Sequence, residues 1–135
     1  MVLEHIAIWT HRLEELKDFY VKYFNATPNE KYISKREFSS RFESYFLSFD
    51  STARLELMQM ETILQGDNEA GKQTTGLTHI AISVDTREEV DEISGRLKKD
   101  GYTIAGEPRL TGDGYYEACV LDPDGNRVEI VALPQ

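Results

Sequence analysis

The hydrophobic positions of the chain change their spacing along its length. Residues 2–10 form a β-branched and aromatic run that predicts a strand. Apolar side chains then recur at helical spacing over 13–24, with charged residues on the opposite face. Three strand-like stretches follow near 31–39, 44–49 and 54–60. The first half therefore predicts a strand, a helix and three further strands.

The second half repeats this order of elements. A strand at 78–84 and a helix at 87–99 are followed by strand-like stretches near 102–105, 115–121 and 127–132. The local signals are a capping box at Thr86 and Glu89, a helix end at Gly101 and a turn at Asp122-Pro123-Asp124-Gly125. Each half is therefore predicted to be βαβββ, and the whole chain to be an α+β domain.

The two halves also share a short motif. Leu3-Glu4-His5-Ile6-Ala7-Ile8 returns, 74 positions later, as Leu77-Thr78-His79-Ile80-Ala81-Ile82. We therefore expect one domain, 1–135, built from a duplicated unit. Its parts would be a first module at 1–61, a polar, Gly-rich linker at 62–76 and a second module at 77–135.

Each half carries one His on its first strand and one Glu on its last. These residues are His5 and Glu56 in the first half, and His79 and Glu129 in the second. Residues two apart on a strand share a face, so each of the four lies opposite the main aliphatic run of its strand. If the aliphatic faces pack on the helices, all four side chains project from the other, concave side of the sheets.

Two imidazoles and two carboxylates are a ligand set for one divalent metal ion. A lone His or Glu on a strand is usually a surface or hydrogen-bonded residue, but four at duplicated spacing are harder to explain in that way. Without thiolate ligands the set suits Zn, Ni, Co, Mn or Fe(II) rather than a closed structural zinc site. The pattern does not choose among these metals.

Composition narrows the class of partner. The net charge of −9 argues against binding to nucleic acid or to an anionic membrane, because both need clustered Lys and Arg. No apolar run is long enough to span a membrane. The single cysteine, Cys119, excludes an internal disulfide framework and fits a reducing compartment. We therefore expect a cytoplasmic protein with a small-molecule ligand.

The repeated βαβββ plan and its His/Glu/His/Glu pattern resemble the vicinal oxygen chelate superfamily (glyoxalase, bleomycin resistance protein, dioxygenase). Within it the match is closest to bacterial glyoxalase I, lactoylglutathione lyase, whose ligands fall at His5, Glu56, His79 and Glu129. The resemblance implies an open barrel of mixed sheet around the metal. It also implies a homodimer in which each site takes His5 and Glu56 from one chain and His79 and Glu129 from the other.

The resemblance implies a metal-dependent lyase or isomerase as well. The expected substrate is a hemithioacetal or a small α-keto compound, converted through a metal-stabilised enediolate. Zn or Ni is the first expectation for the metal, with Co, Mn or Fe as alternatives. Glu129 is the first candidate for the catalytic base, and Glu56 is its partner on the other face of the substrate.

The residues around the site point away from glutathione. Glutathione-using glyoxalases have a basic residue at the place of Trp9 and an Asn at the place of Met60. Together with Met58, these two residues would instead form an apolar pocket wall. Arg109 is a candidate to hold an anionic group elsewhere in the pocket. A different thiol or a small keto compound is therefore expected.

Two alternatives remain open at this stage. One is another reaction of the superfamily, above all epimerisation, which can also use two carboxylates around a metal. The other is a non-catalytic resistance protein that sequesters an aromatic drug. The complete metal quartet counts against the second alternative, whereas Trp9 and the tyrosines favour it.

Overall fold

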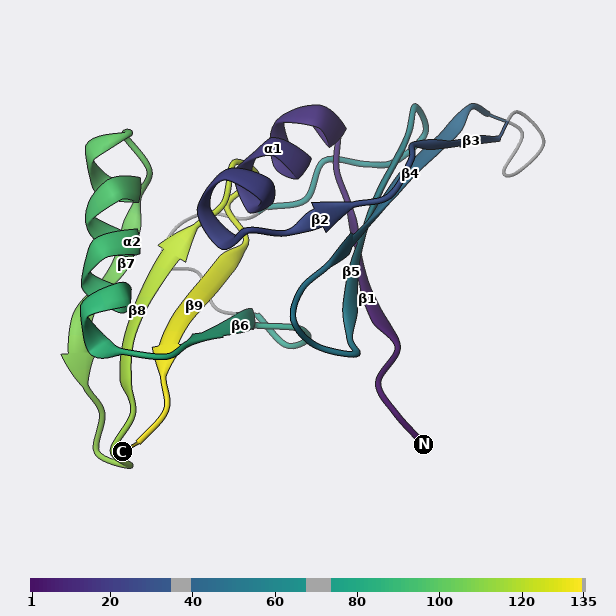
Figure 1. Cartoon of the computed structure of the whole chain (residues 1–135). Coiled ribbons are helices and arrows are strands. Elements are labelled where there is room, and N and C mark those ends of the chain that lie inside the picture. Colours follow the sequence, from purple (N-terminus) through teal and green to yellow (C-terminus); the bar gives the residue numbers. More distant parts are fainter. Residues whose placement is uncertain (35–39, 68–73, 135) are drawn as a thin grey trace. The chain divides into compact units, whose positions relative to one another are not determined.

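The computed structural model describes residues 1–34, 40–67 and 74–134. Its contacts divide the chain into two compact units, Met1–Gly66 and Asp67–Gln135, each with one helix and one sheet (Figure 1). No helix within the described ranges has the length and apolar character needed to cross a membrane.

The first unit contains a mixed sheet with strand order β1-β5-β4-β2, in which β3 also pairs with β4. Its elements are β1 (His5–Trp9), α1 (Leu13–Phe24), β2 (Thr27–Pro28), β3 (Tyr32–Ser34), β4 (Phe42–Ser48) and β5 (Arg54–Met60). Strand β1 runs parallel to β5, and the other pairs are antiparallel.

The outer strand of this sheet differs from the prediction. The stretch expected at 31–39 begins as β3, while its residues 35–39 lie outside the described residues. A further strand, β2, precedes it and was not predicted. Two residues, one of them Pro28, are too few to produce an alternating pattern, and proline is tolerated only at such an edge position.

The second unit contains a mixed sheet with strand order β6-β9-β8-β7. Its elements are β6 (His79–Val84), α2 (Arg87–Lys99), β7 (Ile104–Leu110), β8 (Tyr116–Leu121) and β9 (Arg127–Ala132). Strand β6 is parallel to β9, just as β1 is parallel to β5. The α+β class and the two tandem βαβββ modules are therefore confirmed.

Each helix covers one face of its own sheet. In the first unit Leu47, Leu55 and Leu57 are buried together with the apolar stripe of α1. In the second unit the buried set is Val90 and Leu97 of α2, Ala118 and Val120 of β8, and Val128 and Ile130 of β9. Burying these side chains accounts for about 25 cal/mol of stabilisation per Å² of apolar area. The alternate residues of the same strands therefore lie on the opposite face of each sheet.

The helix ends follow local sequence chemistry. The Thr86 hydroxyl accepts from the backbone N–H of Glu89, and the Glu89 carboxylate accepts from that of Thr86, as the capping box requires. Gly101 follows α2 with φ of 91°, a conformation that glycine adopts without steric cost. In the first unit Asn25 takes the corresponding left-handed position, with φ of 52°.

Removing the α2 cap should destabilise the second unit. We expect Thr86→Ala to lower the free energy of unfolding by about 1 kcal/mol, because the Glu89 N–H loses its acceptor at the helix start. Thr86→Ser keeps the hydroxyl and is the matched control. Chemical denaturation followed by far-UV circular dichroism measures both variants. Equal stabilities of the Ala and Ser variants would contradict the role of the cap.

Candidate metal centre and adjoining pocket

The first His–Glu pair lies on the open face of the first sheet. Parallel pairing of β1 with β5 places Ala7 directly beside Glu56, and His5 beside Arg54. Because Ala7 carries only a methyl group, the space above the Glu56 carboxylate stays open toward the imidazole of His5. The His5 Nε2 atom lies 3.7 Å from Glu56 Oε2.

The second pair repeats this arrangement in its own sheet. Ala81 lies beside Glu129, and His79 lies beside Arg127. The His79 Nε2 atom lies 3.2 Å from Glu129 Oε2. The side chains of Glu56 and Glu129 are 14% and 24% exposed, and each His side chain is 40% exposed. Both pairs are therefore accessible, while their carboxylates are half-buried.

The separations suit two ligands on one divalent ion. Two ligand atoms about 2.1 Å from a metal, at 90° to 110° to each other, are about 3.0 to 3.4 Å apart. The second pair falls within that interval, and the first pair exceeds it by a few tenths of an ångström, within reach of a small side-chain rotation. Each pair also combines one nitrogen with one carboxylate oxygen, a donor set suited to Zn, Ni, Co, Mn or Fe.

The structure brings the four candidate ligands together as two pairs, one in each unit. Within residues 1–34, 40–67 and 74–134, no group of three or more His, Cys, Asp or Glu side chains is placed to hold a metal. Each unit therefore contributes one His–Glu pair.

The first pair has a supporting carboxylate. Glu4 accepts from His5 Nδ1, and it also accepts from Arg54, whose Nε lies 2.8 Å from the carboxylate. Hydrogen bonds from His5 and then Arg54 hold the pKa of the Glu4 carboxyl below its usual value. With Nδ1 directed at Glu4, the Nε2 atom of His5 faces Glu56.

Arg54 connects this network to an aromatic ring. Its guanidinium lies 4.2 Å from the centroid of Phe46, and the His5 ring meets Phe46 edge-on, with centroids 5.3 Å apart. In the second unit Thr78 occupies the position equivalent to Glu4. A carboxylate therefore precedes the histidine of the first pair, whereas a hydroxyl residue precedes that of the second.

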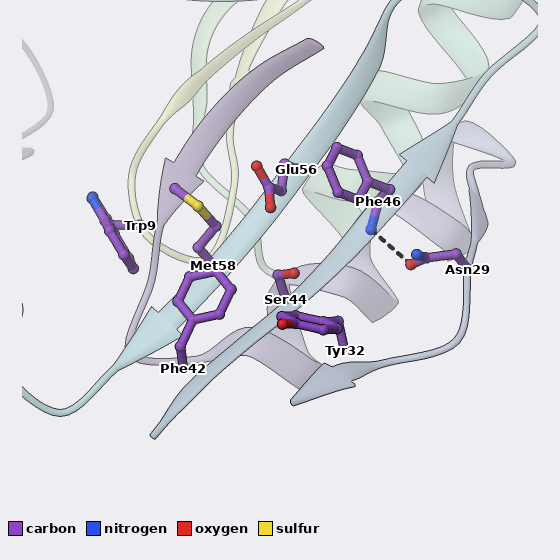
Figure 2. A pocket seen from close by; sticks show the side chains of 8 residues that line it. All are labelled: Trp9, Asn29, Tyr32, Phe42, Ser44, Phe46, Glu56 and Met58. Atoms are coloured by element: carbon purple, nitrogen blue, oxygen red, sulfur yellow. Dashed lines mark hydrogen bonds between the residues drawn. The ribbon is translucent and has the colours of Figure 1, made fainter. Parts of the chain in front are cut away.

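A pocket of about 660 Å³ opens beside Glu56 on the same face of the first sheet (Figure 2). Strands β1 and β5 contribute the predicted residues Trp9, Glu56 and Met58. Met60 lies on the same face of β5 but opposite Phe42, and it does not line this pocket. The remaining lining residues are Asn29, Tyr32, Phe42, Ser44 and Phe46.

Sequence reasoning missed these five residues, and for the three on β4 the reason is that the two faces of this strand look alike. The strand alternates Phe42, Ser44 and Phe46 on one face with Glu43, Tyr45 and Leu47 on the other, and both faces hold aromatic and polar side chains. Only pairing with β5 decides the orientation, by placing Phe46 beside Glu56 and Ser44 beside Met58. The register between β4 and β5, and not the composition of β4, therefore identifies the face that lines the pocket.

The open face of the second sheet has a different chemistry. Cys119 and Arg127 flank Glu129, and Glu117 lies further along β8. The predicted pocket residue Arg109 is located here, on β7, with its guanidinium 3.4 Å from the Glu117 carboxylate. Burial raises the pKa of the Cys119 thiol, although Arg127 opposes the shift.

Known structures share this fold over the whole chain. Glyoxalase I from Zea mays, in a V278E mutant, matches 98% of this chain and 45% of its own, with a TM-score of 0.78 and 23% identity. The trypanothione-dependent glyoxalase I of Leishmania major matches 98% of this chain and 86% of its own, with a TM-score of 0.73 and 23% identity. The match to a glyoxalase family protein from Bacillus cereus covers 100% of this chain and 94% of that protein, with a TM-score of 0.76 and 15% identity.

Sequence comparison gives the same assignment. The uncharacterized protein YqjT of Bacillus subtilis is 35% identical over 60 residues, which cover 42% of this chain and 47% of that protein. The match thus spans about half the length of this curated relative. The profile of the Glyoxalase/Bleomycin resistance protein/Dioxygenase superfamily matches residues 2–130. The chain belongs to this superfamily, the vicinal oxygen chelate superfamily.

Proposed function

We propose that the protein is a metal-dependent lyase or isomerase of the glyoxalase I type, acting on a hemithioacetal or a small α-keto compound. The observation that supports it best is the duplicated His–Glu pair, held in the same parallel register in both units. Two ordinary surface His–Glu contacts would not be expected at equivalent places in both halves, each beside an alanine. A shared ligand role accounts for that repetition.

The proposed ligands are His5, Glu56, His79 and Glu129. Superfamily members typically bind a divalent metal ion, and Zn or Ni is our first choice. When bound, such an ion supplies Lewis-acid polarisation of the substrate's neighbouring oxygen atoms. The Glu4 carboxylate would position His5 by fixing which ring nitrogen carries the hydrogen.

The two glutamates would also move the proton. We propose that a carboxylate oxygen of Glu129 removes the proton from the carbon next to the carbonyl group, and that a proton is then returned to the neighbouring carbon. Glu56 would flank the opposite face of the substrate. Both carboxylates are partly buried, and one side of each stays open to a ligand.

We further propose a homodimer in which each metal site combines the first-unit pair of one chain with the second-unit pair of the other. One chain holds a single His5–Glu56 pair and a single His79–Glu129 pair. A symmetric pair of chains could therefore complete two equivalent four-ligand sites. A site within one chain is the competing arrangement, and it uses the same residues.

One observation favours a second function, the sequestration of an aromatic drug without turnover. The first-unit pocket is lined mainly by aromatic and apolar side chains, as such a role requires. Epimerisation, the other reaction considered above, would use the same metal and carboxylates. Metal content and assays with hemithioacetal and epimerisable substrates separate these functions.

Metal content is the direct test of the ligand set. Untagged wild-type protein should contain about one divalent ion per chain, because each chain supplies four ligands. Glu56→Gln and Glu129→Gln should each lose most of that metal and the activity on hemithioacetals. The control is Glu107→Gln, since Glu107 is a surface carboxylate paired with Lys98. Elemental mass spectrometry gives the metal content, and wild-type metal in both ligand variants would rule out the proposed site.

The support from Glu4 can be tested against the second unit. Glu4→Gln should weaken metal binding about tenfold, because His5 loses the carboxylate that fixes its orientation. Thr78→Ala alters the equivalent residue of the other unit and should leave the affinity unchanged. Isothermal titration calorimetry measures both variants. Equal affinities for Glu4→Gln and the wild type would show that Glu4 does not position the ligand.

Mixing two inactive variants tests the dimeric site. In a dimer of His5→Ala with His79→Ala, one of the two shared sites keeps all four ligands. Random mixing should therefore restore about a quarter of wild-type activity, because about half of the dimers are mixed and each has one intact site. Each variant alone, mixed only with itself, is the control. Failure of recovery, with mixed dimers confirmed by native mass spectrometry, would place the site within one chain.

A further inference from the structure

We propose that Arg127 binds a carboxylate group of the ligand, beside the His79–Glu129 pair. The ligand is then an organic acid, with its carboxylate one or two carbons away from the oxygen atoms that the metal holds. This inference rests on the proposed function for the metal, and it adds the chemical class of the substrate. Binding of a carboxylate at Arg127 can be measured without any turnover.

Strand pairing places Arg127 on the open face of the second sheet, next to both proposed metal ligands of that unit. Strand β9 lies between β6 and β8 (Figure 1). Arg127 precedes Glu129 by two residues on β9, so their side chains share a face and their Cα atoms are about 6.6 Å apart. His79 lies directly beside Arg127 on β6. The long side chain of Arg127 can therefore reach a group bound next to either ligand.

The guanidinium of Arg127 has hydrogen-bond donors to spare. Across residues 1–34, 40–67 and 74–134 it forms no ion pair with a carboxylate, and its side-chain partner is the thiol of Cys119. A thiol is a weak acceptor, whereas a guanidinium carries five N–H donors in a planar fork. Arg127 is also half-buried, which makes an ion pair stronger than it would be in bulk water. An anionic group is the partner that such a cation favours.

The equivalent arginine of the first unit already has a carboxylate partner. Each arginine lies directly beside the histidine of its own unit, Arg54 in the first and Arg127 in the second. Arg54 donates to Glu4 at 2.8 Å. Thr78 stands at the position of Glu4 in the second unit and supplies no negative charge. The duplicated arginine is therefore neutralised within the protein in one unit and available to a ligand in the other.

The charge balance of the site also favours an anion. Under the proposed function a divalent ion offsets the negative charges of Glu56 and Glu129, and histidine ligands are neutral. The Arg109 guanidinium and the Glu117 carboxylate, on the same open face as Arg127, lie 3.4 Å apart and offset each other. Arg127 then leaves this face with a positive charge. A ligand carboxylate can neutralise it through two parallel hydrogen bonds, the geometry in which a guanidinium binds most strongly.

Two hydroxamates that differ in one group test this inference on zinc-loaded protein. Propionohydroxamate is neutral, and malonomonohydroxamate carries a carboxylate in place of its methyl group. Both offer the metal the same two neighbouring oxygen atoms. We expect the carboxylate compound to bind wild-type protein about tenfold more tightly in isothermal titration calorimetry, and Arg127→Gln to remove that advantage. An advantage that persists in Arg127→Gln, or its absence from the wild type, would overturn the inference.

The matched control is Arg87→Gln, which removes the same charge from helix α2, on the other face of the second sheet. This variant should keep the full advantage of the carboxylate compound. Propionohydroxamate reports the integrity of the metal site, and its affinity should change less than about twofold in either variant. Arg127→Lys keeps the charge without the planar fork and should keep part of the advantage, so the test survives misfolding of Arg127→Gln.

Zinc content of the same samples separates this inference from the proposed function. Protein that binds zinc but gains nothing from the carboxylate refutes the role of Arg127 and leaves the metal site standing. Protein that binds no zinc refutes the metal site instead. Titration of metal-free wild type and Arg127→Gln with malonomonohydroxamate then decides on Arg127 alone, because equal affinities would refute its role and weaker binding by the variant would support it.

Discussion

Parallel pairing of a His strand with a Glu strand is the constraint on which the rest of the structure depends. It occurs as β1 with β5 and again as β6 with β9, and in both cases alanine is the residue beside the glutamate. A register shift of one residue would turn the glutamate to the helix-covered face and an aliphatic side chain to the open face. Burial of Leu55 and Leu57, and of Val128 and Ile130, prevents that shift. The core thus sets the position of each His–Glu pair.

The duplicated frame has diverged on its open faces. The first unit presents an aromatic pocket and a histidine supported by Glu4, whereas the second presents Cys119, Glu117 and two arginines. Packing requires only that the residues on the helix-covered face of each sheet stay apolar. The residues on the open face can therefore differ between the two units. Under the proposed function, both halves contribute metal ligands, and Arg127 of the second half binds a carboxylate of the ligand. This division gives the open face of each module a separate role.

Much of the frame could be predicted from local patterns. The bounds of α2, β5 and β9 match the prediction, because a helical stripe with a capping box and two strands of strict alternation leave little ambiguity. The short strand β2 was missed, because two edge residues carry no period. The pocket was only half anticipated: Trp9 and Met58 line it, whereas Phe42, Ser44 and Phe46 come from a strand whose two faces look alike in sequence.

The sequence by itself determined the duplication, the α+β class and the face on which His5, Glu56, His79 and Glu129 lie, because strand alternation and internal repetition are local properties of the chain. Only the tertiary structure decided which side chains are neighbours across strands. It brought Arg54 to His5 and Glu4, and Phe46 and Ser44 to the pocket, through pairings between segments distant in sequence. Such contacts depend on register, which is fixed by burial of whole sheet faces and not by any one segment.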